Sequence, residues 1–213
     1  MKSSISKNKK YGFTIVELIV VITLLAILGT IGFVSYVEYI SSSRDSSRIS
    51  QIQIINQAIE GNTRGRAPIP DDKVTIYANG VKIGYQGYAG ENVLTEIGVN
   101  EGGKDPKDGT YYTYFVDSKQ KYTQLLAFLE NEEKTLTYRP LINQAKAVDY
   151  TERIAKTYGA KLGVLVEIDT KTPVQELSIV KAGGLDVVTT TGSYTLTSVG
   201  GYLSLIGCSN YNG

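Results

Sequence analysis

The stretch that decides the fold is residues 8–34, NKKYGFTIVELIVVITLLAILGTIGFV. The lysines end at Lys10, and an apolar run of 22 residues then extends from Phe13 to Val34, with Glu17 as its one charged residue. A helix of that length measures about 33 Å, which is enough to cross the hydrocarbon core of a bilayer, about 30 Å thick. The run therefore predicts a membrane-spanning helix.

The leader before this run is basic. It contains four lysines and no acidic residue, and a flank of this kind stays on the cytoplasmic side of the membrane. A secretory signal peptide is one alternative, but its apolar core has only about 7–15 residues and a small-residue cleavage site follows it. A plain single-pass anchor is the other alternative. It accounts for the length and the lysines but leaves Glu17 unexplained.

Glu17 is the unusual residue of the run. A lone carboxylate in a membrane-length helix is costly to insert and marks a functional site by default. We therefore expect Glu17 to have a cationic partner.

The segment Gly12-Phe13-Thr14-Ile15-Val16-Glu17, behind a lysine-rich leader and before an unbroken apolar helix, resembles the N-terminus of type IV pilins and type II secretion pseudopilins. The resemblance implies that a prepilin peptidase cleaves between Gly12 and Phe13 and N-methylates Phe13. It also implies that Glu17 pairs with the terminal amine of a neighbouring subunit during filament assembly. The family often has a proline where this chain has Val34, so a kink there is not implied.

The same resemblance implies an α+β fold, in which a long N-terminal α-helix packs on a mainly antiparallel β-sheet with added short helices. It divides the chain into four parts. These are a cleaved basic leader (residues 1–12), the transmembrane half of the helix (13–34), its amphipathic half (35–61) and an extracytoplasmic globular β-rich domain (62–213).

The amphipathic half is also indicated by its own residues. Ile49, Ile52, Ile55 and Ile59 recur at three- or four-residue spacing, which is typical of one apolar stripe on a helix. The helix should end near residue 61, where a glycine follows the stripe. Residues 41–48, SSSRDSSR, are polar all round, and we expect them to be solvated or packed against neighbours in a filament.

Beyond the helix, residue patterns predict a small set of elements. The Asn79-Gly80 pair between two β-branched and aromatic runs is the clearest hairpin signal, for a type I′ turn. The elements expected are a hairpin over 74–86, a short helix over 91–97, a strand over 111–117, a strand or a helix over 122–129, a helix over 145–158 and a buried strand over 161–169.

Composition excludes several kinds of site. The chain has no histidine, so a Ser-His-Asp triad, a Cys-His pair and most zinc sites are excluded. It has one cysteine, Cys208, which cannot form a disulfide within the chain. Removing the four leader lysines leaves 18 basic and 21 acidic side chains, a net charge of −3. That balance argues against direct nucleic-acid binding, and nothing in the sequence predicts an enzyme.

The most motif-like stretch outside the helix is residues 104–112, KDPKDGTYY. It resembles an Asp-Pro turn followed by aromatic residues that many pseudopilins carry, where some family members bind calcium. Asp105 and Asp108 would then supply two of the oxygen ligands that calcium prefers. The alternative, which the sequence favours, is a plain turn, since Asp-Pro and Asp-Gly form turns by themselves. No other cofactor is expected.

Together these features predict a structural subunit of a type IV pilus or a related filament. Its expected partners are further pilin subunits, a prepilin peptidase and an inner-membrane assembly platform. The precursor would span the inner membrane once, and the assembled filament would be extracellular or periplasmic. The alternatives are a type II secretion pseudopilin and a membrane-anchored surface binding domain that does not polymerise.

Overall fold

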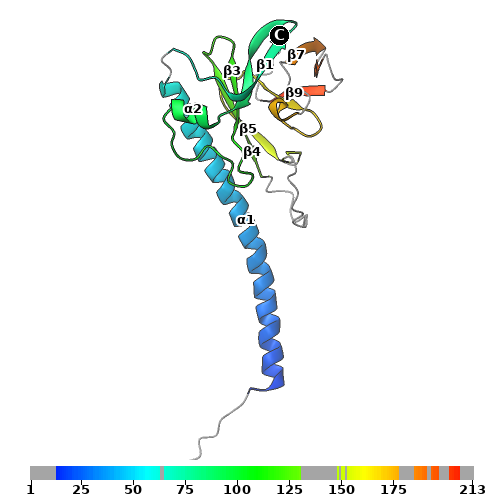
Figure 1. Cartoon of the computed structure of the whole chain (residues 1–213). Helices are drawn as coiled ribbons and strands as arrows, with labels where there is room; N and C mark the ends of the chain where they lie inside the picture. Colours follow the sequence, from blue (N-terminus) through cyan, green and yellow to red (C-terminus); the bar gives the residue numbers. More distant parts are fainter. Residues whose placement is uncertain are drawn as a thin grey trace, which may run out of the picture. The chain divides into compact units, whose positions relative to one another are not determined.

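The structure is a computed structural model that describes residues 13–62, 65–130, 148, 150–151, 153–177, 185–190, 193–196 and 202–206. The chain divides into two compact units, Met1–Ile40 and Ser41–Gly213. One helix, α1 (Ile15–Asn62), contributes its first 26 residues to the first unit and the rest to the second (Figure 1).

The first unit consists of the apolar part of α1. Its side chains are exposed all round, as shown by Leu28 at 66% and Phe33 at 65%. A continuous run of large apolar residues with no buried side is typical of a helix whose surroundings are lipid or other helices.

The second unit is built on a nine-stranded sheet with the order β5-β4-β3-β2-β1-β7-β8-β9-β6. All neighbouring strands are antiparallel except the pair β1 and β7. The sheet is therefore mainly antiparallel, as expected for the α+β fold. The strands are β1 (Asp71–Ala78), β2 (Val81–Tyr88), β3 (Thr113–Asp117), β4 (Thr123–Leu129), β5 (Ile154–Gly159), β6 (Val164–Glu167), β7 (Leu185–Thr190), β8 (Ser193–Leu196) and β9 (Tyr202–Ile206).

The predicted hairpin is confirmed. Asn79 and Gly80 join β1 to β2, with φ values of 51° and 78°. A type I′ turn needs positive φ at both central residues, and Asn and Gly tolerate it best. The short helix expected over 91–97 is also present, as α2 (Glu91–Glu96).

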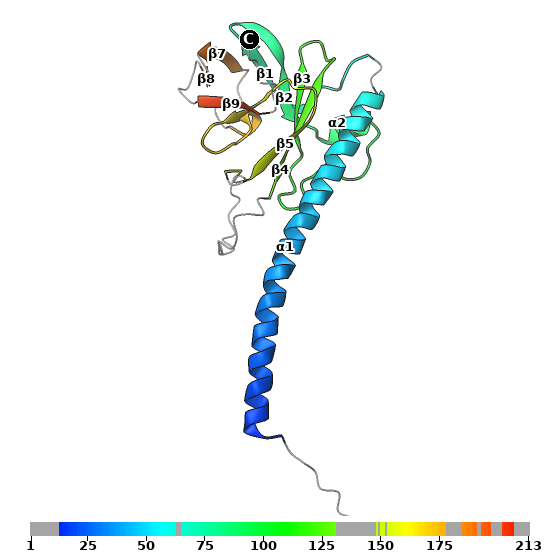
Figure 2. The same cartoon turned by 180° about the vertical axis from the view of Figure 1, so that it is seen from behind.

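One face of the sheet packs against α1 and α2. Three isoleucines of the α1 stripe, Ile52, Ile55 and Ile59, are fully buried there at 0–1% exposure, whereas Ile49 is half-buried. The three pack with Val93 and Leu94 of α2. Figure 2 gives the same view from behind, and α2 and strands β7–β9 lie at opposite sides of the unit in both views. The amphipathic half of α1 thus holds the globular part, as its spacing predicts.

On the other face, the side chains of β1, β3 and β4 pack against β6, the last strand in the sheet order, and against the short 3₁₀ helix η1 (Val174–Glu176). At this contact the buried side-chain amide of Gln86 bonds the β6 backbone in the way that a neighbouring strand would. The Gln86 side chain donates to the Leu165 carbonyl (2.9 Å) and accepts from the Leu165 N–H (2.9 Å). Burial of β6 is tolerated because its backbone polar groups find partners, in the ladder with β9 and, at Leu165, in the Gln86 side chain.

Residues 122–129, for which the sequence allowed a strand or a helix, form β4. Its side chains from Thr123 to Phe128 are all buried. A strand covered on both faces has no reason to alternate apolar and polar residues. Its sequence therefore lacks the usual strand signature.

The prediction of a helix over 145–158 is wrong for the residues of this range that form β5. Residues 154–159 form β5, an antiparallel partner of β4. Ala155 packs on the core at one face, and Tyr158 packs on the core at the other, as strand alternation requires. At the end of β5, Gly159 has φ +94°, and a Cβ there would collide with the Thr123 carbonyl. Tertiary pairing with β4 overrides the local helix signal.

Candidate functional site

The N-terminal end of α1 is closed by a capping box. The Thr14 hydroxyl accepts from the Glu17 N–H (3.2 Å), and Glu17 Oε2 accepts from the Thr14 N–H (2.9 Å) and hydroxyl (3.0 Å). Thr14 is the N-cap and Glu17 the third helical residue, which is the spacing that this motif requires. Glu17 therefore helps to cap the N-terminal end of α1 and is also the one charged residue of the apolar run from Phe13 to Val34. Among the described residues, no partner binds its other oxygen, Oε1.

The helix that follows is suited to a membrane. It is the one helix in the described part of the chain that is long and apolar enough to cross a bilayer, judged by length and composition. None of its most apolar 18-residue window is buried within the protein. Phe13, directly before it, is 90% exposed. Gly12 and Cys208 lie outside the described residues.

The Asp105 turn has the expected turn geometry. The Asp105 Oδ1 accepts from the backbone N–H groups of Lys107 (2.8 Å) and Asp108 (3.1 Å). The Gly109 N–H donates to the Asp105 carbonyl (2.9 Å). An aspartate that satisfies the two following backbone groups in this way stabilises a turn by itself.

Both predicted calcium ligands face arginines. Arg48 donates to Asp105 through Nε (2.7 Å) and Nη2 (2.9 Å), and Arg153 forms a two-point ion pair with Asp108. Guanidinium and carboxylate match in this paired geometry. No group of three or more His, Cys, Asp or Glu side chains arranged to hold a metal occurs in the described part of the chain. The residues as they lie do not fit a calcium site, and calcium binding stays a prediction.

Arg48 is the centre of a larger ionic cluster. Its side chain is fully buried, and its Nη1 contacts Asp45 (2.5 Å) and Glu130 (2.9 Å) in addition to the two contacts with Asp105. Glu130 also binds Arg44 at 2.7 and 2.6 Å and Lys107 at 3.1 Å. Three cations and three carboxylates meet here. We call them the Arg48 cluster: Arg44, Asp45, Arg48, Asp105, Lys107 and Glu130.

The cluster corrects the expectation for residues 41–48. That segment was expected to be solvated or to face other subunits, but Asp45 and Arg48 are buried inside their own fold. They fix α1 to the Asp105 turn and to the end of β4, since the Glu130 N–H also donates to Asp45 (2.9 Å). Buried charges are tolerated because each one is paired and hydrogen-bonded.

The cluster changes the acidity of its carboxyl groups. Burial alone would raise the pKa of Glu130, but Arg44, Lys107 and Arg48 outweigh it and hold this pKa at about 2. Burial opposes ionisation of Asp105 too, yet Arg48 and the two backbone N–H groups keep its pKa below the ordinary value. Both carboxylates therefore stay ionised in mildly acidic conditions.

The spacing of the cluster residues on α1 carried a signal that sequence reasoning missed. Asp45 and Arg48 precede Ile52, Ile55 and Ile59 at steps of three and four residues, so they continue the buried stripe. Glu130, which follows β4, and Arg153, which precedes β5 and pairs with Asp108, had no such signal, because they are distant from α1 in the sequence.

The comparison with family models agrees with the N-terminal geometry. Residues 7–33 match the prokaryotic N-terminal methylation motif. The chain carries the prepilin-type signature. This signature is found in type IV pilins and pseudopilins. Together with the apolar helix, it fits a membrane-anchored precursor of the pilin or pseudopilin type. The motif points to a structural subunit. Comparisons with curated proteins and with solved structures gave no match.

Proposed function

We propose that this chain is a structural subunit of a type IV pilus or a related filament and that assembly, not catalysis, is its work. The observation that carries the proposal is the N-terminal signature on an exposed apolar helix with a single charge, Glu17, in its first turn. An intramembrane carboxylate needs a cationic partner. Its bonds within the described chain come from the neutral groups of Thr14.

Processing would supply that partner. A prepilin peptidase would cut between Gly12 and Phe13 and N-methylate the new terminus at Phe13. The cap at Thr14 would survive, because its N–H belongs to the Phe13–Thr14 peptide bond, which is not cut. Glu17 would keep Oε2 on the cap and offer Oε1 to the terminal amine of a neighbouring subunit. An assembly platform in the inner membrane would then extract the subunit into an extracellular or periplasmic filament.

The first test is the intact mass and N-terminal residue of the protein purified from native membranes. A chain that begins with N-methyl-Phe13 is the expected result. A chain that still begins at Met1, in cells that process other prepilins, would contradict the proposal and favour the anchored surface domain.

The second test separates the two roles of Glu17. Gln at this position can still complete a capping box but cannot pair with an amine as an ion. We expect Glu17→Gln to remain in the membrane and to lose most filament incorporation, measured by shearing and immunoblotting. Glu17→Asp, which keeps the charge, is the matched control and should retain more. Wild-type filament yield from Glu17→Gln would sink the pairing role.

A type II secretion pseudopilin is the second candidate. It is favoured by the Asp105 turn, which precedes Tyr111 and Tyr112 as in the pseudopilin pattern. Deletion of the chain should then abolish protein secretion and leave surface pili intact. Loss of surface pili with secretion unchanged would point to the pilus instead.

A further inference from the structure

We infer that the second unit binds a second copy of itself through two oppositely charged surfaces on the two sides of α1. The first is the acidic α2 surface, Glu91, Glu96 and Glu101. The second is the basic end, Lys119, Lys121 and Lys161. The inference rests on the proposed filament function and names the contact between its globular parts.

The acidic α2 surface is mainly negative, with Lys104 after Glu101 and Lys73 after Asp71 as the nearest positive charges in the sequence. Its three glutamates are all exposed, and the sequence from 83 to 103 contains no lysine or arginine. Val93 and Leu94 pack into the core and thereby turn the polar side of α2 outward. Asp71 adds a further negative charge beside α2, where its carboxylate accepts from the Asn92 N–H (3.0 Å) and side chain (3.1 Å).

The basic end gathers residues from two connections. Lys119 and Lys121 lie in the turn between β3 and β4, and Lys161 follows β5, where the Ala160 N–H donates to the Thr123 carbonyl (2.8 Å). All three lysines are exposed. The one acid of this turn, Asp117, is engaged by backbone, since it accepts from the N–H groups of residues 119, 121 and 122.

An exposed aromatic side chain completes the basic end. Tyr122 is 50% exposed, and the Lys121 ammonium lies 5.2 Å from the centre of its ring. Tyrosine beside cations is typical of surfaces that bind another protein.

The two surfaces lie on opposite sides of α1. Gln51 and Asn62 reach the α2 side, where Gln51 accepts from the Gly103 N–H (3.2 Å) and Asn62 contacts the Glu96 carbonyl. Asn56 reaches the β5 side, where its side chain is next to Gly159. At roughly 100° per residue, Gln51 and Asn62 share one line along the helix and Asn56 lies about 140° round from it. The buried isoleucines fall between.

Because the two surfaces lie on opposite sides of α1, this arrangement suits contact with a second copy and does not favour a closed dimer. When the basic end of one copy meets the acidic α2 surface of the next, the first copy keeps its acidic α2 surface free and the second keeps its basic end free. Such a head-to-tail contact propagates as an open filament where the rotation between successive copies does not close a ring. Opposite potentials would bring the two surfaces together and set their register.

Charge reversal of each surface tests the contact in the full-length chain. The acidic reversal is Glu96→Lys with Glu101→Lys, and the basic reversal is Lys119→Glu with Lys121→Glu. Each alone should lower the sheared filament yield by about tenfold, and the two together should restore it, because the surfaces then match again with their signs exchanged. Filament yield from the wild type should fall as salt rises.

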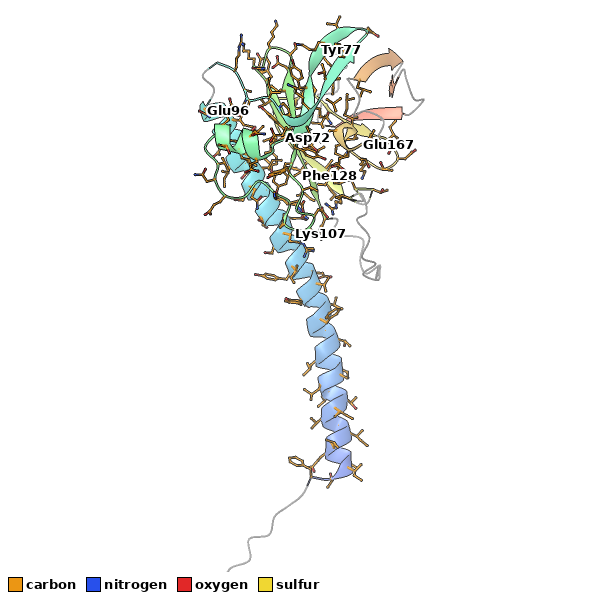
Figure 3. The ribbon with its side chains drawn as sticks, viewed as in Figure 1. Asp72, Tyr77, Glu96, Lys107, Phe128 and Glu167 are labelled. Atoms are coloured by element: carbon orange, nitrogen blue, oxygen red, sulfur yellow. The ribbon has the colours of Figure 1, made fainter. Side chains whose placement is uncertain are left out.

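Two exposed charges elsewhere provide matched controls. Asp169→Lys changes a turn that begins at Glu167, and Glu167 and Glu96 lie on opposite sides of the second unit (Figure 3). Lys82→Glu changes an exposed residue of β2 that pairs with Tyr77, away from Glu96 (Figure 3). Both should leave filament yield unchanged, and all variants should melt like the wild type.

The outcomes separate the inference from the function on which it rests. Wild-type filaments with normal yield from either reversal, or a combined variant no better than the single reversals, would overturn the inference alone. Failure of the wild type to form filaments, in cells that process and assemble other prepilins, would overturn the proposed function and the inference together.

Discussion

The two halves of α1 invert the usual relation between polarity and burial. In residues 15–40 the apolar side chains are exposed, as with Ile27 at 52%. In residues 41–62 the most deeply buried side chains include an arginine, Arg48, at 0%. The difference teaches that the first half is shaped for surroundings other than water. The second is shaped to be held by its own domain.

The largest effect should come from breaking the ionic contact of the second half. Arg48→Met would leave Asp45, Asp105 and Glu130 with less counter-charge in a buried place. Removing one partner of such a site costs about 3–5 kcal/mol, so we expect the free energy of unfolding to fall by that amount. Urea unfolding of the full-length chain in detergent micelles measures it.

Arg44→Met is the control for this prediction. The Arg44 side chain is 29% exposed and pairs with Glu130, which keeps Arg48 and Lys107 as partners. A partly solvated pair contributes about 1 kcal/mol or less. If Arg48→Met were no more damaging than Arg44→Met, the ionic cluster would not be what holds α1 in place.

The next effect compares the two halves directly. Ile27 and Ile54 are both isoleucines of α1 and both 52% exposed. A lysine near the centre of a membrane span costs about 3 kcal/mol of insertion free energy, whereas a surface substitution in water changes stability by only about 0.5 kcal/mol. Ile27→Lys should therefore reduce membrane insertion, and Ile54→Lys should not.

Membrane insertion in a cell-free translation system measures this difference. If both lysine variants inserted as well as the wild type, the first half would not lie in a bilayer. If both variants lost insertion to the same extent, the boundary between the halves would lie further along α1 than Ile40.

Much of the fold could be predicted because its signals are local. The apolar run, the isoleucine stripe, the Asn79-Gly80 turn and α2 each depend on residues within one short window, and each is present in the structure. The N-terminal signature is local too. Its residues from Phe13 to Glu17 fall within the matched motif.

The burial of Asp45 and Arg48 could be inferred from their place on the stripe, but their partners could not be predicted, because the ionic cluster joins residues far apart in the chain. Arg48 meets Asp105 across 57 positions and Glu130 across 82. No window contains both partners, so a polar segment next to a membrane span resembles a solvated one. The helix predicted over residues 154–158 was wrong for the same reason, since the strand β5 that forms there depends on pairing with β4.

The smallest effect concerns how the second half of α1 responds to acid. Glu130 has a pKa of about 2 in the folded chain against an ordinary value of 4.5. A lowered pKa means that the unfolded chain binds the proton first as the pH falls. The stabilisation by Glu130 is therefore complete above pH 4.5 and is lost between pH 4.5 and about 2.

The size of this loss follows from the shift. One pKa unit corresponds to about 1.4 kcal/mol, and with allowance for water access to Glu130 we expect a loss on the order of 2 kcal/mol. Glu176 acts with the opposite sign in a separate window. Burial raises the pKa of Glu176 despite the hydrogen bond that the Tyr150 hydroxyl donates to it. The contribution of Glu176 to stability therefore changes at pH values above 4.5.

Unfolding free energies of the wild type and Glu130→Gln, measured from pH 6 to 2, test this directly. Gln keeps the shape of Glu130 and cannot titrate, so the variant should be less stable at pH 6 and should show a flatter decline below pH 4.5. The first half of α1 should show no matching loss of helix by circular dichroism in micelles, because Arg48 and its carboxylate partners lie beyond Ile40. Parallel curves for the two proteins would mean that acid weakens the second unit through carboxyl groups other than Glu130.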